Sequence, residues 1–178
     1  MIYESFYYKN DLEKIAVKMR KRLKQKRWSE RSYFPFEKDV FWAFYIIRKL
    51  IETRAKISNR TAQMEVDLIA YPLGVSKPNH FNRFEYWDLY DLSKPQTIVK
   101  KLPFICNQAI HSYVFCPDWD KGGEMGVVLN SFNERDKFLY RIDLSQLIVI
   151  LETVAKDYPS SGWTQFNVET HDYDFFDD

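Results

Sequence analysis

The side chains best suited to chemistry lie between Leu102 and Asp120, where one of the three histidines, both cysteines, an asparagine and two aspartates occur. If residues 104–111 form a helix, Asn107 and His111 are four positions apart and share a face. A histidine transfers protons near neutral pH, and an amide beside it can hold a phosphate or orient a water molecule. The pair therefore indicates a hydrolytic site. The alternative is that both side chains bond to the backbone where helix changes to strand.

The run Cys106-Asn107-x-x-x-His111 resembles the Arg-Asn-x-x-x-His signature of HEPN-type ribonucleases, in which Arg and His flank the cleaved phosphate. Cys106 stands where that signature has arginine, and a thiol lacks the fixed charge and paired donors of a guanidinium. The resemblance implies a ribonuclease-like role for Asn107 and His111.

A longer stretch, from about Phe84 to Pro159, resembles a family of uncharacterised bacterial proteins. The matching residues are Leu89-Tyr90-Asp91-Leu92, Leu102 to Gln108, Ile110 to Phe115 and Asp157-Tyr158-Pro159. This resemblance implies a cytoplasmic bacterial protein and carries no activity with it.

The segment 102–120 does not have the spacing of a metal site. His111, Cys116, Asp118 and Asp120 are potential donors, but zinc needs three or four converging ligands, and no Cys-x-x-Cys or His-x-x-x-His pair occurs. The glycine-rich phosphate loops of nucleotide-binding enzymes are also missing. We therefore expect neither metal nor cofactor, and the lack of a complete catalytic set favours a protein that is not an enzyme.

A second chemically distinctive region is the basic segment, Lys14 to Arg31, in which nine basic residues are opposed only by Glu30. Its charge suits phosphates and its aromatic neighbours suit base stacking, as single-stranded nucleic acid requires. A basic amphipathic helix also suits an anionic membrane surface or an acidic protein. The candidate binding residues are Lys14, Lys18, Arg20, Lys21, Arg22, Lys24, Lys26, Arg27, Trp28 and Arg31.

Charge is divided unequally along the chain. Residues 1–61 carry 16 basic and 7 acidic residues, whereas residues 62–178 carry 10 basic and 18 acidic ones. So dense a run of positive charge repels itself and needs an anionic partner. Either that partner is external, or the two parts of the chain neutralise each other.

The totals predict an ordinary folded protein. A chain of 178 residues with 46% hydrophobic content is the size of one domain and needs no disulfide or metal for stability. Two cysteines and no secretory signal favour the cytoplasm. The longest apolar run, Val40 to Ile47, is too short for a transmembrane segment.

Hydrophobic periodicity predicts a single α+β domain over residues 1–178, with a basic helical part (1–61) and an acidic, strand-containing part (62–178). We expect a basic amphipathic helix starting at Asn10 and a buried second helix over about 36–57. A strand at 65–73, a weak helix between Pro95 and Pro103, and a short helix at 104–111 follow. Strands at 112–116, 125–132 and 138–142 form an antiparallel meander, a helix capped by Asp143 closes the fold, and the tail from Ser160 has no strong periodicity.

Three functions are open at this stage. The first is a binding or interaction module in which the basic helix engages nucleic acid or an acidic protein. The second is a hydrolase or ribonuclease-like enzyme centred on His111 and Asn107. The third is a structural, self-associating protein, a homo-oligomer or a chain whose charged halves pair internally. Because no catalytic set is complete, we favour the first.

Overall fold

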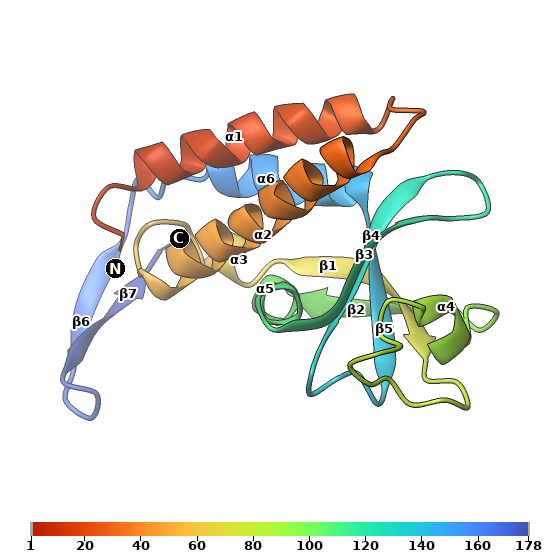
Figure 1. The fold of residues 1–178 in the computed structure, drawn as a ribbon. Helices are drawn as coiled ribbons and strands as arrows, with labels where there is room; N and C mark the ends of the chain where they lie inside the picture. Colours follow the sequence, from red (N-terminus) through yellow and green to blue (C-terminus); the bar gives the residue numbers. More distant parts are fainter. Residues whose placement is uncertain (1, 178) are drawn as a thin grey trace.

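The computed structural model describes residues 2–177 and has an α+β architecture. Helices α5 (Leu102–Ile110) and α6 (Leu144–Lys156) lie against a five-stranded sheet (Figure 1). Helix α1 (Ser5–Arg22) packs on α6, and α2 (Glu30–Glu52) packs on both α1 and α5. The predicted fold class is confirmed.

The sheet is antiparallel throughout, with the strand order β2-β1-β5-β4-β3. The predicted meander is confirmed as β3 (Ser112–Trp119), β4 (Met125–Ser131) and β5 (Phe138–Asp143). The predicted strand at 65–73 is β1 (Glu65–Pro72), which joins β5 to the edge strand β2 (Gln96–Lys101). Every residue of β4 is buried, because both faces of this central strand are covered.

The two faces of the sheet carry separate apolar clusters. Val66 and Leu68 of β1 and Leu129 of β4 belong to the main core beneath the helices. On the opposite face, Val128 and Leu139 pack against α4 (Tyr86–Leu89) and its loop. The alternation of side chains along a strand sends neighbouring residues to these two clusters.

Helix α1 begins at Ser5 and not at Asn10 as predicted, and the Glu4 carboxylate accepts a hydrogen bond from Phe6 N at 2.9 Å. Its buried face extends back through Lys9, which is 1% exposed. The Lys9 ammonium donates to the Asp157 carbonyl and lies 3.7 Å from the centre of the Tyr158 ring, and burial lowers the pKa of Lys9. Because lysine is usually a surface residue, Lys9 does not count toward the apolar pattern, and the pattern predicts a helix that starts after it.

The predicted second helix is present with different bounds, and one other predicted element is wrong. The second helix starts at Glu30, where Ser29 and Ser32 form a capping box, and ends at Glu52 before a left-handed residue, Ala55 (φ 64°). The weak helix expected between Pro95 and Pro103 is instead strand β2 followed by α5. Pairing with β1 from Glu65–Lys101 to Ala70–Gln96 supplies the backbone partners of β2, and that pairing is invisible to a local pattern.

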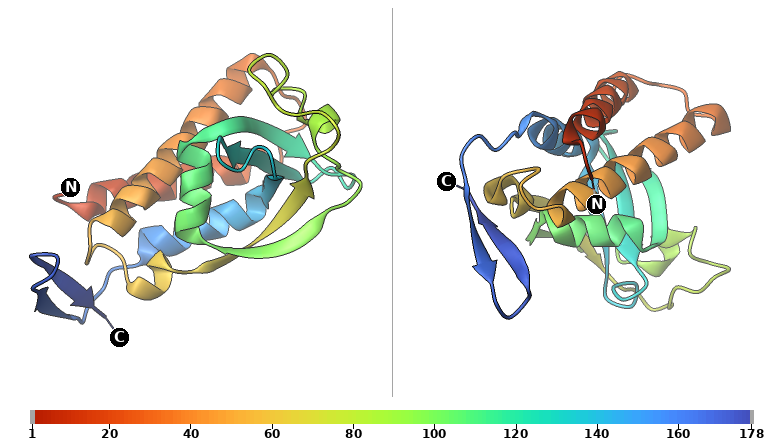
Figure 2. Two further views of the ribbon diagram at one scale, coloured as in Figure 1. Left: turned by 90° about the horizontal axis from the view of Figure 1, so that it is seen from below. Right: turned by 90° about the vertical axis from the view of Figure 1, so that its left-hand side faces the viewer.

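Helix α6 closes the sheet domain, but it is not the last element. The chain continues into a hairpin of β6 (Trp163–Asn167) and β7 (Asp172–Phe176), which stands beside the end of α2 and apart from the sheet (Figure 2). Short helix α3 (Asn59–Ala62) lies next to it, and Asn59 N donates to Asp177 at 2.7 Å. None of the helices in residues 2–177 has a stretch long and apolar enough to cross a membrane.

Candidate functional site

The sequence predicted that the basic residues from Lys14 to Arg27 lie on one helix, but the helix ends before Lys24. Helix α1 ends at Arg22, the chain from Leu23 to Ser29 forms a connection, and Arg31 lies in the first turn of α2. Within this connection Trp28 is half-buried, and its ring lies 5.6 Å from that of Phe36 and 5.4 Å from that of Trp119, centre to centre. Trp28 is thus committed to internal packing and is poorly placed to stack on a base.

Three lysines and arginines of the basic segment have carboxylate partners. Lys18 Nζ lies 2.8 Å from Asp39 of α2, and Arg20 lies 2.5 Å from Glu152 of α6. Lys14 makes only a 3.4 Å contact with Asp11 on its own helix. Within residues 2–177, the other six have no carboxylate oxygen within 4.0 Å: Lys21, Arg22, Lys24, Lys26, Arg27 and Arg31.

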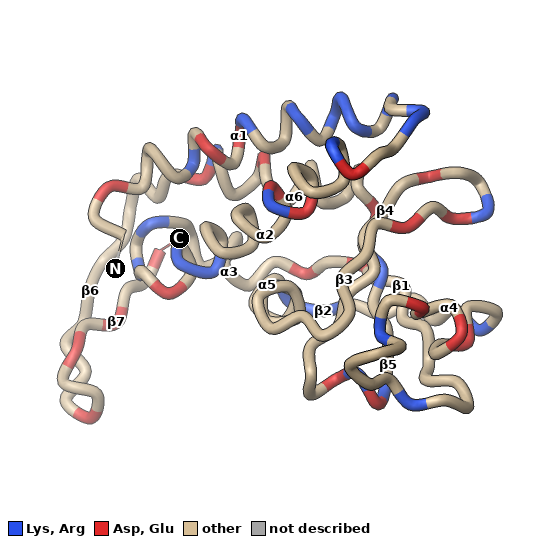
Figure 3. The backbone as a smooth tube through the Cα atoms, viewed as in Figure 1, with Lys and Arg blue, Asp and Glu red and all other residues tan. Residues whose placement is uncertain are grey.

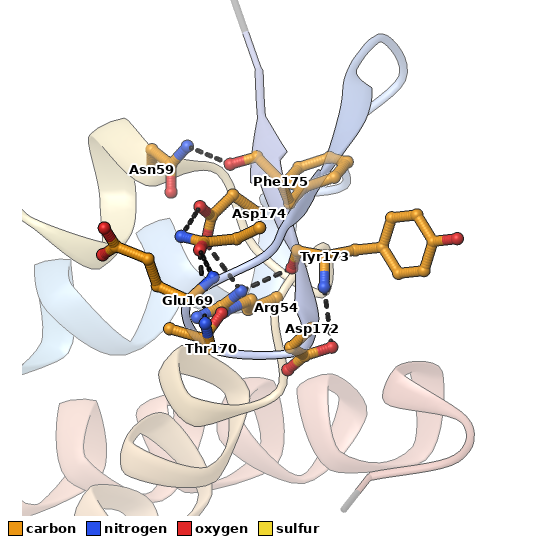
Figure 4. Close-up of polar contacts among 9 residues, drawn as sticks. Arg54, Asn59, Glu169, Thr170, Asp172, Tyr173, Asp174 and Phe175 are labelled. Carbon is orange, nitrogen blue, oxygen red and sulfur yellow. Dashed lines mark hydrogen bonds and ion pairs between the residues drawn. The ribbon is translucent and has the colours of Figure 1, made fainter.

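The acidic tail, residues 169–177, lies at the end of the molecule opposite to the basic segment (Figure 3). Asp174 of the hairpin pairs with Arg54 at 2.9 Å, and the Arg54 guanidinium also donates to the Tyr173 carbonyl (Figure 4). The neighbouring Thr53 hydroxyl accepts a hydrogen bond from Ile2 N, just before α1 begins. Helix α1 has 18 residues and is about 27 Å long, whereas charge is screened over about 8 Å at physiological ionic strength. The tail therefore does not neutralise the free cations at the far end of α1 in the same molecule.

The exposed side of the basic segment also carries apolar surface. Val17 and Leu23 are about half exposed, and they line a shallow cleft of about 400 Å³ with Arg20, Lys21 and Lys24. A surface that combines exposed apolar and cationic side chains is typical of a site that binds a large anionic partner.

The second candidate region is a cleft of about 540 Å³ between the end of α5 and the turn after β4. The structure brings Asn107 and His111 to this cleft, with both side chains exposed. His111 is the C-cap residue of α5, and its backbone N–H donates to the Asn107 carbonyl at 3.1 Å. The remaining lining residues are Gln108, Ser131, Phe132, Asn133 and Glu134.

A guanidinium stands beside this pair. Arg48 of α2 donates to Asn107 Oδ1 at 3.0 Å and to Glu52 at 2.6 Å. Across the cleft, burial raises the pKa of Glu134, but hydrogen bonds from Lys137 and Tyr140 outweigh burial and lower it overall. The cleft therefore combines an imidazole, an ionised carboxylate and an amide that an arginine holds in place.

Sequence reasoning did not find Arg48 or Glu134. Arg48 lies 59 positions before Asn107, and only the packing of α2 on α5 brings them together. Cys106, which occupies the arginine position of the resembled signature, is buried, and burial raises the pKa of its thiol to about 12. Burial also raises the pKa of Cys116, so neither thiol is an activated nucleophile.

In the part of the chain that the structure describes, no three His, Cys, Asp or Glu side chains are grouped so as to hold a metal ion. Comparison of the chain with protein-family models, with curated proteins and with solved structures found no match.

Proposed function

We propose that this protein binds single-stranded nucleic acid through the basic segment. The observation that carries this proposal is the group of six basic residues that have no carboxylate partner in the described chain, while the acidic tail lies about the length of α1 away. Phosphates would supply the missing counter-charge and release their own counterions on binding. The exposed Phe34, one helical turn after Arg31, offers a ring on which a base can stack.

A cytoplasmic location is part of this proposal, since free cysteines persist in a reducing compartment, where nucleic acids are also present. The internally neutralised form of a self-associating protein is less well supported, because among the described residues Arg20 alone of the basic segment pairs with a carboxylate of the acidic part, Glu152. The C-terminal tail contacts Arg54 and Asn59 instead. Pairing between chains remains an outcome that the experiment below can detect.

The test is the salt dependence of binding to a labelled single-stranded oligouridine. We expect the triple variant Lys21→Gln/Lys24→Gln/Arg27→Gln to bind more weakly and to reduce the slope of log K against log salt by about 2, at about 0.7 per lost phosphate contact. These three side chains are exposed, so the fold should not change. Fluorescence anisotropy over a salt series measures both quantities.

The matched control removes the same charge elsewhere, with Lys77→Gln/Lys101→Gln/Lys156→Gln, all exposed and without an ion pair among the described residues. It should retain the wild-type slope. Equal slopes for the two triple variants would contradict the proposal. Competition by polyglutamate as strong as by RNA would instead assign the surface to an acidic protein, and salt-sensitive self-association would assign it to a second copy.

The cleft beside α5, where Asn107 and His111 lie together, supports a second candidate function. We propose phosphodiester hydrolysis there, with His111 as the proton-transferring group and Asn107, oriented by Arg48, as a phosphate or water ligand. This candidate ranks below nucleic-acid binding because the Arg48 charge is already paired with Glu52 at 2.6 Å.

Hydrolysis of a chromogenic phosphodiester tests this second function. If it is correct, His111→Ala should lower the rate by about 100-fold or more, as loss of a general acid or base does. His80→Ala, at another exposed histidine in the loop before α4, should leave the rate unchanged. Identical rates for wild type and His111→Ala would eliminate the enzyme hypothesis at this cleft.

A further inference from the structure

Two arginines next to the cleft converge on one aromatic ring. Arg83, from the loop before α4, has its guanidinium carbon 5.5 Å from the centre of the Tyr113 ring. The guanidinium carbon of Arg135, from the turn between β4 and β5, lies 4.7 Å from the centre of the same ring. The two cationic centres are therefore no further apart than the sum of these distances. Like charges this close repel each other, and more strongly at a partly buried site than in water.

Among the described residues, Arg83 has no carboxylate oxygen within 4.0 Å, and Arg135 has one ion pair that is not a hydrogen bond. Among residues 2–177 neither donates a hydrogen bond through its side chain, and the Nε atom of each is buried without an acceptor. The single carboxylate nearby, Asp136, lies 3.8 Å from Arg135 Nε, which is too far for a hydrogen bond, and its side chain is 48% exposed. Buried donors without a protein acceptor are rare in folded proteins, and a bound ion or an ordered water normally satisfies them.

Aromatic packing holds both side chains in place without satisfying their donors. Arg83 lies 5.2 Å from the centre of the Phe84 ring, and Arg135 lies 3.9 Å from that of Phe132. A cation–π contact uses the face of a guanidinium and not its N–H edge, so these contacts do not occupy the Nη donors. An anion with several oxygens, such as phosphate, matches that arrangement of donors.

Phe132 connects the two arginines to the cleft. Its ring meets Tyr113 edge to face at 5.8 Å, is 60% exposed, and forms part of the cleft wall. The cleft volume of about 540 Å³ is within the usual range for small-molecule sites. Asn107, Asn133 and His111 on the same walls offer both donors and acceptors, as the edge of a nucleobase requires.

We propose that this region binds a nucleoside monophosphate, with the phosphate between Arg83 and Arg135 and the base in the cleft beside Phe132. The site is separate from the basic segment. It shares its cleft with the proposed hydrolytic function but does not rest on it, because binding requires no proton transfer. A negative result for hydrolysis at His111 therefore leaves this proposal standing.

Isothermal titration of the full chain with uridine monophosphate, uridine and inorganic phosphate tests the proposal. We expect the monophosphate to bind at least tenfold more tightly than either fragment. Arg83→Gln/Arg135→Gln should lose at least tenfold in affinity for the monophosphate. The basic-segment variant Lys21→Gln/Lys24→Gln/Arg27→Gln should retain wild-type affinity, which separates this site from the nucleic-acid surface.

Phe132→Ala provides a second variant whose fold is not at risk, because the ring is largely exposed. It should lower the affinity for the monophosphate more than the affinity for inorganic phosphate, because Arg83 keeps its contacts with Phe84 and Tyr113 when the Phe132 ring is removed. Equal affinity of the wild type for uridine and its monophosphate would overturn the phosphate site. Equal affinity for phosphate and the monophosphate would overturn the assignment to a nucleotide, as would wild-type affinity in Phe132→Ala.

Discussion

Arg141→Met is expected to lower the free energy of unfolding by about 3 kcal/mol, because it removes the buried arginine of an ion network and leaves the mostly buried Asp118 without its counter-charge. Asp143 is 38% exposed and keeps its hydration. The Arg141 side chain is 1% exposed. Its Nε donates to Asp118 at 2.7 Å, its Nη2 donates to the Glu124 carbonyl at 2.8 Å, and its Nη1 donates to Asp143. Burial alone would lower the pKa of Arg141, but the two carboxylates raise it overall.

The consequence of losing Arg141 extends beyond the ion pairs themselves. Asp118 also accepts a hydrogen bond from Tyr86 Oη at 2.6 Å, so the network joins β3, β5 and the α4 loop on one face of the sheet. Gly126 of β4 leaves room for the guanidinium, because a Cβ at that position would lie 2.9 Å from Arg141 Cζ. Methionine fills part of the space but cannot satisfy two carboxylates.

Guanidinium chloride unfolding followed by circular dichroism measures the loss. Arg60→Met is the matched control, since Arg60 is exposed and has no ion pair among the described residues, and it should change stability by less than about 0.5 kcal/mol. A loss below about 1 kcal/mol for Arg141→Met would show that the network contributes no more than a surface salt bridge.

Asn130→Ala is expected to cost about 3–4 kcal/mol. Asn130 is 0% exposed, and its side chain satisfies three groups. Its Nδ2 donates to Tyr90 Oη at 2.7 Å and to the Phe138 carbonyl at 2.9 Å, and its Oδ1 accepts from Val114 N at 3.3 Å. Each buried polar group that loses its partner costs about 1–3 kcal/mol, and local relaxation recovers part of the total.

Urea unfolding checks this prediction, with Asn133→Ala on the same turn as the control. Asn133 is exposed, so its replacement should change stability by less than about 0.5 kcal/mol. The Tyr90 hydroxyl also donates to the Arg135 carbonyl at 2.8 Å, so Asn130 supports the turn that carries the proposed nucleotide site. Similar stabilities for the two alanine variants would mean that the Asn130 hydrogen bonds do not hold this turn.

The two stability networks lie apart from the basic segment, whereas the Asn130 network adjoins the cleft beside α5. The Arg141 network lies on the sheet face covered by α4, and the Asn130 network lies at the turn after β4. The basic segment is outside both, at the end of α1 and the start of α2. Substitutions in the basic segment should therefore test binding without the large losses of stability predicted for the two networks.

Much of the fold was predictable because its elements carry their own periodic pattern. Helix α6 was found from one apolar face, including Leu147 and Leu151, and the alternation of Val66 and Leu68 identified β1. Such patterns are local, and burial of one face of an element is enough to impose them. The cap of α1 was misplaced because buried Lys9 resembles a surface residue, and the hairpin at 163–176 was missed because almost all of it is exposed.

The amino-acid sequence is sufficient to establish the charge of the basic segment, the closeness of Asn107 to His111 at the end of one helix, and the α+β class. The packed structure is needed to establish which charges have partners, which arginine lies beside Asn107, and that Arg83 and Arg135 both approach Tyr113. Those relations join residues tens of positions apart. The packing of whole helices and strands sets them, and no periodicity within one element records that packing.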